Sequence, residues 1–162
     1  MVRNRTIIYR CAFGGDDLEK EYYSVVRQLN TLAGELDMLY HCAARRFDIP
    51  DSVLRILYAV CELGDGCLLS DVCRNAGITK QTVNSALRRL ESDGILYLEA
   101  DGKKSKRVYL SAAGHEYVER TAIRLLDAEA RAVSCWSEEE VSEYLRLMNK
   151  YIGSLGEQIK LL

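Results

Sequence analysis

The side chains with the most evident binding chemistry lie in the stretch ITKQTVNSALRRLESDGIL, residues 78–96, which has no carboxylate before Glu91. If this stretch is helical, one face carries Lys80, Gln81, Asn84, Ser85, Arg88 and Arg89, and Thr79 and Thr82 supply further hydroxyls. Asparagine and glutamine can pair bidentately with adenine and arginine with guanine, whereas lysine and short hydroxyls suit phosphates and base edges. These residue types indicate contact with DNA. The simpler alternative is a solvated surface helix, which usually mixes both signs of charge.

The distribution of charge also favours an anionic partner, although the chain as a whole is slightly acidic. The 162 residues have a formal net charge of −2 at pH 7. Residues 74–107 hold eight Lys or Arg against four Asp or Glu, a net of +4, so the remainder carries −6. A basic middle between acidic ends predicts that this part of the molecule meets an anion.

Two short helices are expected to position these side chains. Ser70, itself counted among the expected DNA contacts, is placed to cap a helix over residues 71–76, which Gly77 closes. Thr79 is the N-cap candidate of the next helix, and Asp93-Gly94 ends it. The expected buried face of this second helix has the spacing i, i+3, i+4, i+7 and consists of Val83, Ala86, Leu87 and Leu90. Two short helices joined by a glycine-containing turn predict a helix-turn-helix.

A β-hairpin is expected directly after the second helix. Residues 95–98 and 108–110 are β-type runs that bracket EADGKKSKR, with Asp101-Gly102 in the loop. A hairpin in this place makes a winged helix. The cations of the predicted wing, expected to contact phosphate, are Lys103, Lys104, Lys106 and Arg107.

Long helices are expected at both ends of the chain. A helix of about 30 residues follows Asp16-Asp17, and its apolar residues alternate spacings of three and four: Leu18, Tyr22, Val25, Leu29, Leu32, Leu36, Leu39 and Ala43. Gly114 precedes a helix through about residue 133, and an S-x-x-E capping box at 137–140 starts the last helix. Such wide apolar faces exceed what one small domain covers. Such a face predicts either a central core helix or, as the more specific alternative, a helix at a subunit interface.

The expected fold class is mainly α with a small β-hairpin wing. The winged helix-turn-helix DNA-binding domain spans 50–114, the helical dimerisation region comprises 16–48 and 115–162, and residues 1–15 form an N-terminal arm of uncertain structure.

Several classes of protein are disfavoured. No apolar run is long enough to span a membrane, and the N-terminus does not fit a signal peptide, which predicts a cytoplasmic protein without a membrane partner. The six cysteines are expected to be reduced, with Cys42, Cys61 and Cys73 in the core.

The middle of the chain resembles the MarR (multiple antibiotic resistance regulator) family of bacterial transcription factors. SDVCRNAGITKQTVNSALRRLESDGIL is similar to its helix-turn-helix, and DGKKSKRVYLSAAG to its wing and strand-to-helix junction, where Leu110, Ser111 and Gly114 match the L-T-x-x-G pattern. Family wings usually carry arginine at the tip, where this chain has lysines, so wing binding is expected to be mainly to phosphate. The resemblance implies a homodimer on palindromic double-stranded DNA, in a regulator expected to be a repressor. It also implies a small effector, often aromatic, between the dimerisation helices and the DNA-binding lobe.

Other candidate sites carry weaker signals. Tyr22, Tyr40, His41 and Tyr58 are the expected effector contacts, although such tyrosines more often serve packing. Cys11 is the candidate for a redox trigger, because peroxide-sensing members of the resembled family carry a reactive cysteine near this point. No ligand spacing predicts a metal site, no cofactor is expected, and no catalytic set can be assembled for an enzyme. Two alternatives stay open: a thiol or metal trigger on the same DNA-binding role, and a winged helix used for protein–protein contact.

Overall fold

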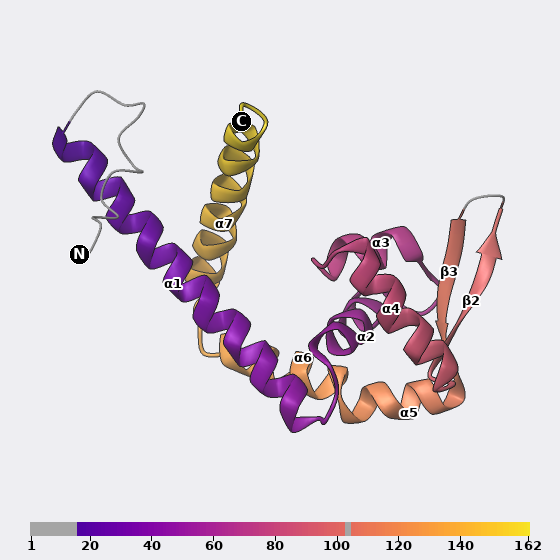
Figure 1. Ribbon diagram of the computed structural model, residues 1–162. Coiled ribbons are helices and arrows are strands. Elements are labelled where there is room, and N and C mark those ends of the chain that lie inside the picture. Colours follow the sequence, from indigo (N-terminus) through magenta and orange to yellow (C-terminus); the bar gives the residue numbers. More distant parts are fainter. Residues whose placement is uncertain (1–15, 103–104) are drawn as a thin grey trace, which may run out of the picture. The chain divides into compact units, whose positions relative to one another are not determined.

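The computed structural model describes residues 16–102 and 105–162, with side chains from residue 21 onward. The chain divides into two compact units, one ending at Ala43 and the other spanning Ala44–Leu162. The expected fold class is confirmed: the protein is mainly helical with a small antiparallel sheet. The elements are α1 (Asp16–Arg46), α2 (Asp51–Leu63), β1 (Cys67–Leu68), α3 (Leu69–Asn75), α4 (Lys80–Ser92), β2 (Leu96–Asp101), β3 (Ser105–Leu110), α5 (Ala112–Arg120), α6 (Ala122–Val133) and α7 (Glu138–Ile159) (Figure 1).

The helix-turn-helix forms as the apolar spacing predicts. Helix α2 packs against both α3 and α4, and the four predicted apolar residues of α4 are all buried. Gly77 closes the turn between α3 and α4 at a φ of 63°, a value that glycine adopts without strain. The Thr79 hydroxyl caps α4 by accepting a hydrogen bond from the Thr82 backbone N–H at 3.3 Å. Local signals therefore fix where α4 starts and which face it buries.

The wing is a β2–β3 hairpin extended by a third strand. The sheet order is β1-β3-β2, with Cys67 opposite Val108 and Leu98 opposite the same valine from the other side. The wing's two tyrosines, Tyr97 and Tyr109, face each other across β2 and β3 and stack with ring centroids 5.4 Å apart. The short strand β1 thus anchors the hairpin to the start of α3.

Two expectations about helix starts are wrong. Helix α3 begins at Leu69 with Leu68 as its N-cap residue, so Ser70 lies inside the helix and does not cap it. Leu68 is extended because it pairs with Arg107 in the sheet, and the helix follows the strand without a gap. The helix after the wing also starts earlier than expected, at Ala112, and it is interrupted at Thr121 into α5 and α6.

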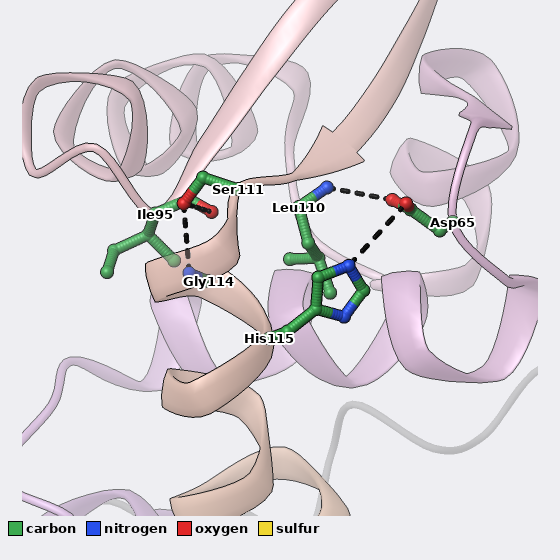
Figure 2. Close-up of polar contacts among 6 residues, drawn as sticks. All are labelled: Asp65, Ile95, Leu110, Ser111, Gly114 and His115. Carbon is green, nitrogen blue, oxygen red and sulfur yellow. Dashed lines mark hydrogen bonds and ion pairs between the residues drawn. The ribbon is translucent and has the colours of Figure 1, made fainter.

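Gly114 is required by close packing within α5 and does not precede the helix. A Cβ built on Gly114 would lie 2.0 Å from the Ile95 carbonyl oxygen. Ser111 caps α5 by accepting from the Gly114 N–H at 2.9 Å (Figure 2). Its hydroxyl donates to Gly94 O at 2.6 Å. Since Gly94 follows Asp93, the C-cap residue of α4, this junction ties the end of the second helix to the base of the wing. Asp65 adds a further tie by accepting from the Leu110 N–H at 2.8 Å.

Helices α1 and α7 each carry an exposed apolar seam. On α1, Tyr22, Leu32, Leu36 and Leu39 are between 49% and 66% exposed. On α7, a run with spacings of three and four is between 38% and 62% exposed: Leu145, Met148, Ile152, Leu155 and Ile159. The capping box predicted for α7 is confirmed, with Ser137 and Glu140 each bonded to the other's backbone N–H. Within the described ranges, none of the helices has the length and hydropathy needed to cross a bilayer.

Candidate nucleic-acid interface

The exposed side of α4 carries the side chains predicted to meet DNA. Lys80, Gln81, Asn84, Ser85, Arg88 and Arg89 are all exposed, as are Thr79 and Thr82 at its start. The first turn of α4 has no acidic residue. The Thr79 and Thr82 hydroxyls are 2.9 Å apart and share a hydrogen bond, so one of them remains able to donate outward. The helix therefore presents amides, cations and hydroxyls to solvent as one continuous surface.

A groove separates this helix from the wing and from the start of α3. Its volume is about 530 Å³ and its lining combines the three elements. The polar side chains of the groove are Ser70, Lys80, Asn84, Arg88, Glu91, Ser105 and Lys106, and its other residues are Leu69, Cys73, Leu87 and Leu98. Five predicted contacts, Ser70 and Lys106 among them, are thus brought together on one concave surface. The cations, amide and hydroxyls of this lining are the groups that contact sugar-phosphate strands.

Four further predicted contacts on α4 lie outside the groove lining, and Thr82, which is bonded to Thr79, is one of them. Gln81, Ser85 and Arg89 follow the groove residues by one position each, which turns them about 100° around the helix. The Ser85 hydroxyl donates to Gln81 O at 3.1 Å. Arg89 lies 3.7 Å from Asp93, but both side chains are more than half exposed, so the pair holds the guanidinium only weakly. The exposed surface of α4 thus has two sides. Lys80, Asn84 and Arg88 line the groove, and Gln81, Ser85 and Arg89 lie outside it.

Arg107 is already engaged within the wing. Its Nη1 donates to Gly66 O at 2.7 Å, and its Nε lies 3.0 Å from an Asp101 carboxylate oxygen. A phosphate contact through Arg107 would have to compete with both interactions, whereas Lys106 is exposed. Lys103 and Lys104 lie outside the described residues.

Six groove residues were not among the predicted contacts: Leu69, Cys73, Leu87, Glu91, Leu98 and Ser105. A signal for Glu91 exists in the sequence. Lys80, Asn84, Leu87 and Glu91 follow spacings of four, three and four, which place them on one stripe of a helix. For Cys73 and Leu98 no local signal exists, because α3 and β2 meet α4 only in the tertiary structure.

The expected effector contacts are distributed over two helices. Tyr22, Tyr40 and His41 lie on α1, with Tyr22 and His41 exposed and Tyr40 half-buried. Tyr22 and Tyr40 are 18 positions apart, or roughly 27 Å along the helix, so one small molecule cannot contact both in one chain. Tyr58 lies on α2 and its hydroxyl donates to a Glu129 carboxylate oxygen at 2.5 Å.

The described cysteines carry free thiols, but the expectation that Cys42 lies in the core is wrong. Cys42 is exposed, while Cys61 and Cys73 are half-buried. Burial raises the pKa of the Cys61 thiol to about 11 and raises that of Cys67. Both are therefore poor thiolates near neutral pH. Cys11 lies outside the described residues. Among the residues that are described, no three His, Cys, Asp or Glu side chains gather as a metal site would require.

Comparison with known proteins points to one family. A model of the MarR family matches residues 47–107, which include α2, α3, α4 and most of the wing. None of the curated proteins matches the sequence. Among solved structures, a MarR-family transcriptional regulator from Silicibacter pomeroyi is 23% identical, with a TM-score of 0.63 over 78% of this chain and 86% of that one.

Two similar structures contain a bound molecule. The MepR–DNA complex of S. aureus is 25% identical with a TM-score of 0.63, covering 79% of this chain and 94% of that chain. NadR in complex with 4-hydroxyphenylacetate is 17% identical with a TM-score of 0.63, over 78% of this chain and 91% of that chain. The shared fold extends well beyond the segment that matches the family model.

Proposed function

Because the winged helix of this chain, residues 47–107, belongs to the MarR family, we propose that the protein is a transcriptional regulator that binds double-stranded DNA sequence-specifically. The observation that carries this proposal is the exposed side of α4, where amides and arginines stand without an acid in the first turn. The similar MepR structure was solved with DNA. A winged helix built for protein contact would instead present an acidic or apolar face.

In the proposed complex, α4 enters the major groove and its exposed side reads bases as far along the helix as Arg88. Gln81 suits adenine and Arg88 suits guanine, because each can form two hydrogen bonds to the base edge. The groove between α4 and the wing accommodates the backbone of one strand, with Ser70 and Lys106 as phosphate contacts. Lys103 and Lys104 are proposed as additional phosphate contacts, and Arg107 acts mainly by holding the wing.

The protein is proposed to act as a homodimer. The seams of α1 and α7 have the spacing of helices that pack on other helices, and their leucines and isoleucines are half exposed in a single chain. Covering such surfaces with a second copy removes apolar area from water. A two-fold dimer presents two α4 helices, so the operator should be palindromic with half-sites about 34–36 Å apart.

A small aromatic molecule is proposed as the effector that releases DNA, which makes the protein a repressor. NadR, with the same fold, was solved with the aromatic acid 4-hydroxyphenylacetate. Tyr22, Tyr40, His41 and Tyr58 are the proposed contacts, with Tyr22 forming a separate contact region because of its distance along α1. The effector can shift the population only by binding the non-DNA-binding state more tightly.

Selection of bound sequences from random duplex DNA tests the proposal. The full chain should enrich a palindrome with half-sites one helical turn apart, and enrichment of no sequence would refute sequence-specific binding. Aromatic acids should then release the selected duplex. Release by peroxide that Cys11→Ser abolishes would replace the aromatic trigger by a redox trigger.

A further inference from the structure

One side chain in the groove has the wrong charge for a surface that binds phosphate. Among the described residues that line the groove, Lys80, Arg88 and Lys106 are cations, and Glu91 is the carboxylate that stands with them. Glu91 is exposed, and neither a hydrogen bond nor an ion pair within the described part of the chain engages its side chain. Its charge is therefore directed at whatever enters the groove.

The position of Glu91 cannot be explained by the stability of α4. The C-terminus of a helix is its negative end, and an acid in the last turn is unfavourable there. Lys80 is also unfavourably placed, because it is a cation at the first position of the helix, which is the positive end of the helix dipole. Arg89, outside the groove lining, follows the rule for a basic residue in the last turn. Two groove charges on α4 thus oppose the helix dipole.

Glu91 also stands away from the bases. In a helix-turn-helix, the N-terminal residues of the second helix reach the base edges. Glu91 is the twelfth residue of α4, roughly 16 Å along the axis from Lys80. On the wing side it shares the groove with Ser105 and Lys106, where the backbone of a strand would run. Its neighbour on bound DNA is therefore a phosphate.

We propose that Glu91 is a specificity-determining residue that disfavours non-operator DNA by repelling phosphate in the groove. This inference rests on the proposed function. Non-specific binding depends almost entirely on cations meeting phosphates in many registers, and a carboxylate among those cations weakens every such register. On the operator, base contacts from Gln81 and Arg88 hold α4 in one register, in which the strand lies towards Lys80, roughly 16 Å along the helix axis from Glu91. The repulsion then costs less on the operator than elsewhere.

The test compares Glu91→Gln with wild type on the selected operator and on a scrambled duplex of equal length. Glutamine keeps the shape and removes the charge. Glu99→Gln is the matched control. Glu99 is an exposed carboxylate on β2, and it lies outside the groove lining, which its neighbour Leu98 joins. Circular dichroism checks that each variant is folded, and titrations at several salt concentrations give affinity and salt slope.

Glu91→Gln should tighten binding to the scrambled duplex by roughly three- to tenfold per lobe and steepen the salt slope by up to about 0.9 per lobe. The operator should gain less, so the ratio of the two affinities falls, and Glu99→Gln should leave that ratio unchanged. Weaker operator binding with a lost preference at one base pair would make Glu91 a base reader and overturn the inference. Equal effects of both variants, or no effect of Glu91→Gln, would also overturn it. A wild-type chain that binds neither duplex refutes the proposed function itself, and the inference with it.

Discussion

Gly114→Ala should destabilise the protein through a single backbone contact. The added Cβ would meet the Ile95 carbonyl oxygen at 2.0 Å, where a real Cβ needs about 3.0 Å. The first turn of α5 and the residue before β2 must therefore separate by roughly 1 Å. Ser111 bonds to that same carbonyl through its N–H at 3.0 Å and its hydroxyl at 3.2 Å (Figure 2). A separation of that size would make both donor–acceptor distances too long for a hydrogen bond.

The magnitude follows from these contacts. Overpacking of a rigid site costs about 1–3 kcal/mol, and two lost hydrogen bonds cost about 0.5–1.5 kcal/mol each. The higher helix propensity of alanine offsets about 1 kcal/mol of this destabilisation. The net loss is about 3 kcal/mol, which lowers Tm by about 6–12 °C in a chain of 162 residues.

Thermal unfolding followed by circular dichroism at fixed protein concentration measures this loss. Gly34→Ala is the matched control, because Gly34 is exposed within α1 and its added Cβ has nothing within 4 Å. The control should gain about 0.5–1 kcal/mol from helix propensity and raise Tm slightly. If Gly114→Ala melts within about 2 °C of wild type, the junction is not as tightly packed as inferred.

Three other predictions concern the interface, the seam and the thiols. Arg88→Ala should weaken operator binding by roughly 1–3 kcal/mol and relax one base preference, whereas Lys106→Ala should weaken all duplexes alike; identical behaviour in competition titrations would contradict the division of roles. Ile152→Glu should turn a dimer into a monomer in sedimentation velocity, because it would place an unpaired charge in a dry interface, and a variant that stays dimeric would argue against the seam. Iodoacetamide at about pH 8 should label exposed Cys135 well before Cys61, because burial raises the pKa of Cys61 to about 11 and keeps it protonated; mass spectrometry showing Cys61 modified first would refute this.

Features fixed by local sequence were predictable. The start, end and buried face of α4 follow from Thr79, Gly94 and the spacing of Val83, Ala86, Leu87 and Leu90, because capping and helical periodicity act within a few residues. The hairpin and the capping box of α7 were predictable for the same reason.

Features that depend on distant segments were not predictable. Ser70 has the right type for a cap, but Leu68 is held extended by its pairing with β3, so the helix starts before Ser70. Arg107 was expected to face DNA, yet its guanidinium bonds to Gly66 O, 41 positions earlier in the chain. The close approach that requires Gly114 likewise involves Ile95, on the other side of the wing. The spacing of residues along the chain does not predict any of these contacts.

The most direct test of the central claim is a fluorescence anisotropy titration of the full chain with the selected operator and with a scrambled duplex of equal length, over a range of salt. The α4 surface predicts that the operator binds at least about 10³-fold more tightly at physiological salt. It also predicts that both affinities fall as salt rises, with log K linear in log salt. Equal affinity for the two duplexes, or no binding to either at micromolar protein and low salt, would contradict the assignment of α4 as a DNA-reading helix.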